Sequence, residues 1–590
     1  MTPTTETQKS SSSWRQWLVF GLCLLPAVGL AILLRQNTVN VPYWDEWDDD
    51  LASIFLKWHN GTLSFGDYWA QHNESRLVLP RAIFLLLGIF SHWNLGWEVA
   101  TTFLLAAFAA GGVFWLGHKT LAARPLVAGV AAFIASLLIF APAQYQAWLW
   151  GMELILYLPL VCILASLCFL QTNFSKRTKI FFGGVMAVAS TYSFSNGMLA
   201  WLALFPVLFL ADGLAGLKKL RRAALLWLLA FVANVALYFQ DYQFPTSPGL
   251  WSVLCNHPWQ VVAYLFAFLG GPLVDQNSDY AVTAGVIIGG FQFTLFLALG
   301  VVIFRRRKNS EWMRRVWPWL TLGGYGVLSA LLATSGRAAF GAAQALSPRY
   351  GIFGVCLTVA LVYLVPLVAF YSAPSVSGKM RMMVAALAVA VIGLHALALP
   401  AALVNMEVFS LNLRHAKACL KFLDVLPPQP ATRAYLCPSF AKVKTMADAL
   451  DRAHVWNYSL LPTRRLADLK TAPQPVVPLG DIENCRVLGT NFFLSGWALA
   501  SARRAPADCV VFTCEGAGNE PQIFALMDER LVRTDLVEKF HDKKYFLAGW
   551  QKICPFADLP KGALTVRAWS YDAATDRLTP LANVVKLANP

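Results

Sequence analysis

Long apolar runs separated by short polar loops dominate the first 400 or so residues of this chain. Eleven runs approach the roughly 20 residues that a helix needs to cross a bilayer. They cover residues 16–34, 94–118, 125–143, 153–171, 180–195, 198–213, 223–239, 281–304, 316–334, 351–371 and 382–402. Two shorter runs, 77–92 and 258–273, are ambiguous by length alone. The pattern predicts a mainly α protein built as a polytopic transmembrane helical bundle.

The basic residues decide how the two short runs are interpreted. If neither run crosses the membrane, nearly all loop lysines and arginines fall on one side, as the positive-inside rule requires of the cytoplasmic side. These are Lys9 and Arg15; Lys119 and Arg124; Lys176, Arg177 and Lys179; Lys218, Lys219, Arg221 and Arg222; Arg305 to Lys308 with Arg314 and Arg315; and Lys379 with Arg381. We therefore expect about eleven spans, two interfacial or re-entrant helices, a cytoplasmic N-terminus and an exported C-terminus.

The polar regions suggest further divisions. Residues 1–13 are rich in serine and threonine and are expected to form a disordered cytoplasmic leader. The transmembrane domain covers 14–402 and includes an exported loop, 36–93. A mixed, partly helical connector (403–470) and a linker with three prolines (471–478) follow. Residues 479–590 contain short β-like runs at 491–499, 508–513, 522–527 and 563–570, which predict a small exported β-sandwich.

Composition narrows the class of protein. The chain is 57% hydrophobic, which is far too apolar for a soluble globular protein. Its formal charge of +15 comes from short loops between apolar runs, without a zinc-finger spacing or a basic helix, so we expect membrane lipids and no nucleic acid as partners. Six cysteines lie beyond residue 402, an even number that permits disulfides but fixes no pairing.

The segment 41–50, Val-Pro-Tyr-Trp-Asp-Glu-Trp-Asp-Asp-Asp, places five carboxylates directly after the first apolar run. Carboxylates near lipid are costly unless they are solvated, paired or used in chemistry. Asp45 and Glu46 lie between tryptophans, whose partial desolvation would raise a carboxylate pKa toward that of a general base. They are therefore the predicted catalytic residues. The three aspartates at 48–50 are better explained as the start of a helix.

A second polar cluster follows in the same loop and includes His72, Glu74, Arg76 and Arg81. His72 and Glu74 have the chemistry to hold a metal ion or to orient a phosphate. Arg76 and Arg81 can bind an anionic headgroup through bidentate hydrogen bonds. The alternative is an interfacial helix whose arginines snorkel toward water.

A third cluster, Arg337 with Arg349 and Tyr350, lies in the predicted outer loop before the tenth span. Arginines on the outer side run against the usual charge bias and call for an anion, and a phosphate or diphosphate fits. Contact with lipid headgroups is the alternative. These residues complete the predicted substrate-binding and donor-phosphate-binding set.

Taken together, the acidic motif at Asp45–Glu46, the acidic and histidine motif after it, the many spans and the exported C-terminal region resemble the GT-C glycosyltransferases over residues 14–400. The resemblance implies an enzyme that takes sugar from a polyprenyl-phosphate donor on the non-cytoplasmic face, by an inverting single displacement. Asp45 or Glu46 would be the base, and Arg337, Arg349 or Arg76 would stabilise the leaving phosphate.

The resemblance leaves other features open. The acceptor is a cell-envelope glycan, a lipid or a protein. No cofactor is required, but a divalent cation, Mg or Mn, is compatible with Asp45, His72 and Glu74 as ligands. The expected location is a bacterial inner membrane, with the C-terminal domain in the periplasm. Two other functions fit the same pattern: a transporter or flippase of lipid-linked glycans, and a non-catalytic envelope assembly factor.

Overall fold

The computed structural model describes residues 10–47, 52–211, 213–244, 250–371, 378–458, 460–500, 505–516 and 520–589. Most of the predicted leader and the helix start predicted at Asp48–Asp50 lie outside these ranges. The chain forms two compact units. The first contains Met1–Thr38, Ser64–Leu86 and Gly96–Glu407, and the second contains Val39–Leu63, Leu87–Leu95 and Val408–Pro590.

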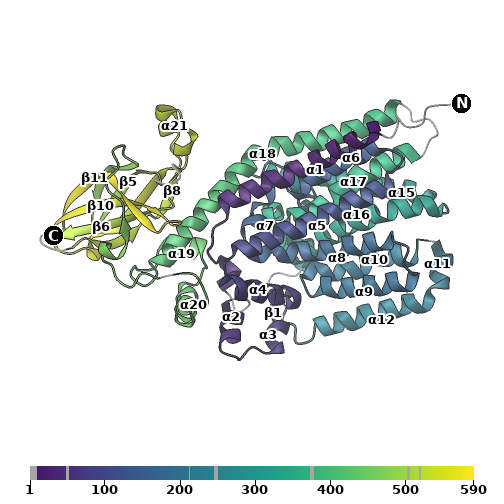
Figure 1. Ribbon diagram of the computed structural model, residues 1–590, viewed down its shortest axis with the longest axis horizontal. Coiled ribbons are helices and arrows are strands. Elements are labelled where there is room, and N and C mark those ends of the chain that lie inside the picture. The colour runs from purple at the N-terminus through teal and green to yellow at the C-terminus, as the bar shows by residue number, and fades with distance from the viewer. Residues whose placement is uncertain are drawn as a thin grey trace. The chain divides into compact units, whose positions relative to one another are not determined.

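The first unit is a bundle of long helices that run side by side (Figure 1). Each of the predicted apolar runs folds as one of them. They are α1 (Ser10–Asn37), α5 (Gly96–Thr120), α6 (Pro125–Ile139), α8 (Leu154–Leu170), α9 (Lys176–Thr191), α10 (Leu199–Phe209), α12 (Arg221–Tyr238), α15 (Ala281–Arg305), α16 (Ser310–Arg337), α17 (Gly351–Tyr371) and α18 (Gly378–Lys421), of which the part up to Glu407 belongs to this unit.

Within the described residues, eight helical segments are long and apolar enough to cross a membrane, or nine if the bent pair Ser195–Phe209 and Gly213–Lys219 forms one span. The polytopic class is therefore confirmed, while the count of eleven spans stays a prediction. Two shorter apolar helices, α4 (Val78–Ser91) and α14 (Pro258–Gly270), correspond to the two ambiguous runs. At 14 and 13 residues neither can cross a bilayer alone.

Short elements connect the long helices of the first unit. The helical ones are α3 (Phe65–Trp69), α7 (Tyr145–Leu149), α11 (Gly213–Lys219) and α13 (Leu250–Asn256). A hairpin of β1 (Gln71–His72) and β2 (Ser75–Arg76) precedes α4. The 3-10 turns are η2 (Pro142–Gln144), η3 (Gly151–Glu153), η4 (Ser195–Met198), η5 (Gly271–Leu273), η6 (Ala338–Phe340), η7 (Ala342–Leu346) and η8 (Pro348–Tyr350).

Burial distinguishes inner helices from outer ones. The apolar window of α17 is 94% buried, so this helix forms the centre of the bundle, whereas the window of α15 is only 22% buried. Outer helices expose large apolar side chains such as Leu226 (65%), Phe291 (62%) and Leu397 (74%). Exposure on this scale is unfavourable in water, and it is expected of surfaces that face lipid.

Small residues let α14 and α15 pack with their backbones in close contact. A Cβ atom added to Gly289 would lie 1.9 Å from the carbonyl oxygen of Phe266, and one added to Gly270 would lie 2.1 Å from that of Gly285. Small residues four apart, here Gly285 and Gly289, are typical of helix pairs in membranes, where van der Waals contact replaces the hydrophobic effect. This packing fixes α14 against the bundle.

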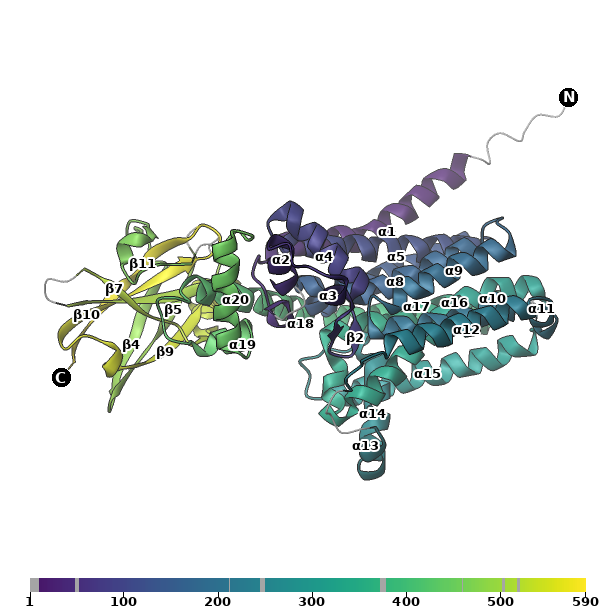
Figure 2. The same cartoon turned by 90° about the horizontal axis from the view of Figure 1, so that it is seen from below.

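The second unit contains a β-sandwich, seen in Figure 2. One sheet has the order β3-β11-β10-β6-β7 and the other the order β4-β5-β9-β8. The strands are β3 (Lys470–Thr471), β4 (Gly480–Leu488), β5 (Asn491–Ala498), β6 (Cys509–Gly516), β7 (Gln522–Leu526), β8 (Glu529–Leu531), β9 (Gly549–Pro555), β10 (Gly562–Asp572) and β11 (Arg577–Asn589). All four predicted strands are present, and Lys470–Thr471, at the junction of the predicted connector and linker, pairs in parallel with β11.

Helices complete the second unit: α2 (Ala52–His59), α19 (Pro430–Tyr435), α20 (Phe440–Ala453) and α21 (Thr534–Phe540), with the 3-10 turns η1 (Trp44–Trp47), η9 (Leu466–Asp468), η10 (Lys543–Tyr545) and η11 (Phe556–Asp558). All eleven cysteines lie in the described ranges and are free thiols. The six beyond residue 402 therefore form no disulfide in this structure, and five of them are buried. Burial raises the pKa of Cys554 to about 12, which keeps this thiol protonated and unreactive at neutral pH.

Candidate functional site

The acidic motif of the first loop forms the turn η1, within the second unit. Aromatic side chains anchor it: Trp47 is fully buried and meets Trp456 edge-on at 6.0 Å, and Tyr43 meets Phe409 edge-on at 5.4 Å. The backbone of Trp44 has a φ of 49°, in the left-handed region that a bulky residue rarely adopts. Strain of this kind persists only where the surroundings enforce it, and it is common at functional sites.

The two predicted bases have different surroundings. Glu46 is buried at 1% exposure, and its Oε2 accepts a hydrogen bond of 2.8 Å from the backbone N–H of Tyr43. This carboxylate therefore stabilises the turn itself. Asp45 is only half-buried, so its carboxylate can be reached from outside the turn. Of the two, Asp45 has the accessibility that a general base needs.

The second polar cluster forms the hairpin β1–β2, within the first unit. The buried guanidinium of Arg76 is held by main-chain carbonyls: Nε donates to Tyr238 at 2.5 Å, Nη1 to Trp69 at 2.6 Å, and Nη2 to Gln240. It also lies over the Trp69 ring, 5.1 Å from its centroid. Arg76 thus ties the hairpin to the end of α12, and its contact with a headgroup stays a prediction.

Arg81, on α4, has a comparable environment. It is 1% exposed, and its Nη1 donates to the carbonyl of Tyr68 at 2.9 Å and to that of Ala70. Because these carbonyls belong to the segment before the hairpin, Arg81 fixes that segment against α4. A side chain this buried does not reach a lipid headgroup outside, and it does not snorkel toward water.

The tip of the hairpin presents Glu74 to an arginine from far along the chain. Nη2 of Arg337 lies 2.7 and 2.8 Å from the two carboxylate oxygens of Glu74. Both side chains are about one-third exposed. The buried His72 lies at the base of this turn, where its Nε2 is 3.0 Å from the amide nitrogen of Asn73. The hairpin and the last turn of α16 therefore share an ion pair that solvent, or a ligand, can reach.

Arg349 forms a second such pair. It lies on η8, just before the central helix α17, with Nη1 3.6 Å from Oε1 of Glu153. The Glu153 side chain is 5% exposed and that of Arg349 is 28% exposed. The guanidinium carbon lies 5.5 Å from the Trp150 ring centroid and 5.3 Å from that of Tyr350. A cation between two aromatic rings and a buried carboxylate is held in place and still faces outward.

Hydrogen bonds connect the loop that carries both arginines to α14. The hydroxyl of Tyr264 donates to Oε1 of Gln344 at 2.5 Å, and Nε2 of Gln344 donates to the hydroxyl of Tyr350 at 3.2 Å. On the same helix, Nε2 of Gln260 donates to the carbonyl of Ala338 at 2.6 Å. The chain next to Arg337 and the chain next to Arg349 are therefore both connected to α14 by hydrogen bonds.

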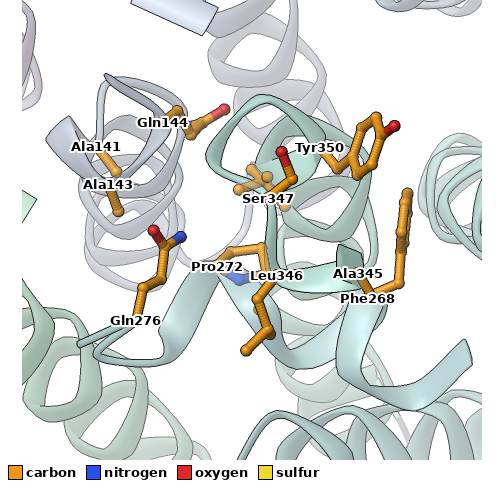
Figure 3. Close-up of a pocket in the computed structure, with 13 residues that line it drawn as sticks. Ala141, Ala143, Gln144, Phe268, Pro272, Gln276, Ala345, Leu346, Ser347 and Tyr350 are labelled. Atoms are coloured by element: carbon orange, nitrogen blue, oxygen red, sulfur yellow. The ribbon is translucent and has the colours of Figure 1, made fainter. Parts of the chain in front are cut away.

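A pocket lies beside this network, between η2, η5 and the turns before α17 (Figure 3). The buried Gln144 lines it and is fixed by hydrogen bonds from its Nε2 to the carbonyls of Leu138 and Ile139, at 3.0 and 3.2 Å. Its polar lining includes Gln276 and Ser347. The predicted binding residue Tyr350 thus lines a pocket that contains hydrogen-bonding groups.

Within the described ranges, no three His, Cys, Asp or Glu side chains form a group that could hold a metal ion. In the first unit, the cation that faces Glu74 is Arg337 rather than a metal held jointly with His72.

No protein-family model and no curated protein matches this chain. A solved structure does: the crystal structure of ArnT from Cupriavidus metallidurans bound to undecaprenyl phosphate. The match has 13% identity and a TM-score of 0.38, and it covers 75% of this chain and 89% of that one. At this identity and TM-score, the match indicates neither the reaction of this chain nor the role of any residue.

The structure thus brings together Glu74, Arg337, Arg349 and Tyr350, and it gives Arg76 and Arg81 supporting positions. The sequence did not predict Glu153 as the partner of Arg349, because this glutamate stands alone at the start of the apolar run 153–171. Gln344 was not predicted either, although this glutamine lies between the two arginines in the sequence. A polar residue in a loop with two outer arginines was a signal that could have been used.

Proposed function

We propose that this protein is a membrane glycosyltransferase. It moves a sugar from a polyprenyl-phosphate donor to a cell-envelope glycan, lipid or protein acceptor, on the non-cytoplasmic face. The observation that carries the proposal is the pair of partly exposed arginines, Arg337 and Arg349, each beside a carboxylate and both on a loop that hydrogen bonds connect to α14. Arginine binds phosphate in bidentate fashion, and two arginines on one loop offer the charge that a leaving phosphate needs.

The carboxylate partners support this use of the arginines. Glu74 and Glu153 orient the guanidinium groups and balance their charge before a ligand arrives. The Nη1–Oε1 distance of 3.6 Å between Arg349 and Glu153 exceeds the usual 2.7–3.2 Å of a hydrogen bond. At this distance, the attraction between these two atoms is electrostatic. A preorganised cation of this kind stabilises charge as it develops in the transition state.

In the proposed reaction, Asp45 takes the proton from the acceptor hydroxyl, and the acceptor oxygen forms a bond to the anomeric carbon of the donor sugar. The bond between that carbon and the phosphate oxygen breaks, and the phosphate leaves with the electron pair. Because a phosphate is a good leaving group, no general acid is needed. Glu46 keeps the turn in shape for Asp45, since its carboxylate caps the backbone of Tyr43.

The test uses full-length protein in nanodiscs, with individually synthesised polyprenyl-phosphate sugars and a membrane extract as acceptor source. Asp45→Asn should lower the transfer rate by about 10²–10⁴-fold, the usual contribution of a general base, and should still bind undecaprenyl phosphate. A flippase would keep its transport activity in this variant. Transfer at the wild-type rate in both Asp45→Asn and Glu46→Gln would rule out both carboxylates as the general base, and no transfer by the unmodified protein would rule out the enzymatic role.

A separate experiment tests the orientation that we propose. In this orientation the loop from Arg337 to Tyr350, the arginine loop, lies on the outer side of a bacterial inner membrane. Ser64 and Ser310 are exposed and belong to opposite predicted sides. In a background without native cysteines, Ser64→Cys should react with an impermeant thiol reagent in intact cells, and Ser310→Cys should react only after lysis. Labelling of Ser310→Cys from outside would reverse the orientation.

A further inference from the structure

A second, more open cavity adjoins the pocket of Figure 3 and shares Gln276, Leu346 and Ser347 with it. Its volume is about 400 Å³, within the range of roughly 300–1,000 Å³ that small-molecule sites occupy. Ser347 and Pro348 form part of its wall. Arg349, which carries the proposed phosphate-binding side chain, is the next residue in the chain. All the residues that line it belong to the first unit.

Two asparagines at this cavity form a reciprocal amide pair. Nδ2 of Asn277 donates to Oδ1 of Asn405 at 3.0 Å, and Nδ2 of Asn405 donates to Oδ1 of Asn277 at 3.1 Å. A carboxamide has two N–H donors and an oxygen with two lone pairs. The mutual pairing uses one donor and one lone pair of each residue, so each amide keeps a donor and an acceptor for a ligand. Adjacent hydroxyl groups of a sugar each donate and accept hydrogen bonds, so they can use both the donor and the acceptor.

The loop that carries Asn277 is preorganised. The backbone N–H of Asn277 donates to Oδ1 of Asp275 at 2.9 Å, and the N–H of Ser278 donates to the Asp275 carbonyl at 3.2 Å. On the opposite wall, the Ser347 hydroxyl donates to Oε1 of Gln146 at 3.3 Å, which orients its oxygen as an acceptor. Hydrogen-bonding groups fixed in this way lose little entropy when a ligand binds.

The charge of the lining restricts the ligand. Among the described residues that line the cavity, Asp279 is the one with a charged side chain, and the remaining polar groups are amides and hydroxyls. A phosphate or a carboxylate would meet the Asp279 carboxylate without a cation from the lining to offset it. Hydroxyl groups, in contrast, find both donors and acceptors. The positive charges of Arg337 and Arg349 therefore lie on the arginine loop, whereas the cavity itself is lined by neutral polar groups and one carboxylate.

We propose that this cavity binds the hydroxyl groups of an uncharged sugar ring and discriminates against uronic acids. Asn277 and Asn405 recognise adjacent hydroxyls, and Asp279 repels a carboxylated sugar. The identification of this sugar as part of a substrate rests on the proposed function. The binding itself requires only the cavity.

Saturation-transfer NMR measures the binding of sugars to the full-length protein in nanodiscs, without donor or acceptor lipid. The probes are the methyl glycosides of glucose, galactose and mannose, each compared with its uronic acid counterpart. At least one neutral glycoside should bind, and its uronic acid should bind at least about fivefold more weakly because of the like charge. Asn405→Ala and Asn277→Ala should each raise the Kd of the neutral glycoside by about fivefold, which corresponds to the loss of one hydrogen bond. Asn256→Ala, an exposed asparagine on α13, is the control and should change nothing.

Asp279→Asn gives an independent readout, because Asp279 is exposed and its replacement should not affect folding. This variant should bind the uronic acids better while leaving the neutral glycosides unchanged. Equal or tighter binding of the uronic acids by the unmodified protein, unchanged binding in Asn405→Ala, or no binding of any hexoside would overturn the inference. Sugar binding without any transferase activity would leave it standing and would count against the proposed function alone.

Discussion

Arg349 offers the sharpest quantitative prediction, because its surroundings are specified on three sides by Glu153, Trp150 and Tyr350. Arg349→Ala removes a cation that is 28% exposed and therefore only partly screened by water. One or two charge-assisted hydrogen bonds to a developing phosphate anion are lost, each worth about 1.5–3 kcal/mol. We expect a total loss of about 2–4 kcal/mol of transition-state stabilisation, or roughly 30- to 900-fold in kcat/KM.

Arg349→Lys separates charge from geometry. Lysine keeps the positive charge but lacks the planar fork that matches two phosphate oxygens. It should therefore lose about 1–2 kcal/mol, less than alanine. The assay is transfer from a polyprenyl-phosphate sugar in nanodiscs, together with native mass spectrometry of bound undecaprenyl phosphate, which requires no knowledge of the sugar.

A matched control is Arg307→Ala, which removes an exposed arginine that also lies over an aromatic ring, 4.1 Å from the Phe304 centroid. Arg307 lies on the predicted cytoplasmic side, so its loss should change neither transfer nor lipid binding. The reasoning is refuted if Arg349→Lys equals the unmodified protein, or if Arg349→Ala and Arg307→Ala have the same effect at equal thermal stability.

Three further predictions concern other parts of the molecule. Gly289→Ala should destabilise the bundle by about 1–3 kcal/mol through overpacking, seen as a lower Tm, whereas Gly300→Ala on the same helix has open space and should not. Glu46→Gln should lower the Tm as well as the transfer rate, because its carboxylate caps the turn, whereas Asp45→Asn should lower the rate alone. Hydrogen bonds from Arg533 hold the pKa of Asp535 below its ordinary value. The stabilisation by this pair is fully present above the ordinary pKa of an aspartate, and it is lost as the pH falls through the lowered pKa of Asp535. Arg533→Met should therefore lower the Tm relative to the unmodified protein at neutral pH, and this difference in Tm should shrink as Asp535 is protonated.

The apolar pattern predicted the helices well because transmembrane helices are specified by composition over many residues. The span count was harder, since α9 and α10 are short and the ends of runs depend on how helices pack. In the sandwich, the four runs that predicted strands are rich in buried residues. Strand β4 was missed because its segment contains three charged residues and much of it is exposed.

The candidate site shows a second limit to what the sequence can predict. Sequence reasoning found Arg337 and Arg349 because outer arginines break the charge bias, a feature of single residues. It gave Arg76 the same role, although the hydrogen-bond partners of Arg76 are mainly backbone carbonyls, two of them more than 160 residues away. A backbone carbonyl is present at every residue and leaves no trace in the amino-acid pattern. Whether an arginine binds a ligand or supports the fold is therefore decided by tertiary structure.

The central claim is that this protein binds the phosphate of a polyprenyl-phosphate donor at its arginine loop. A cryo-EM map of the full-length protein in nanodiscs with undecaprenyl phosphate tests it most directly. We expect phosphate density within hydrogen-bonding distance of the guanidinium of Arg349 or Arg337. Phosphate density beyond the reach of both side chains would contradict it.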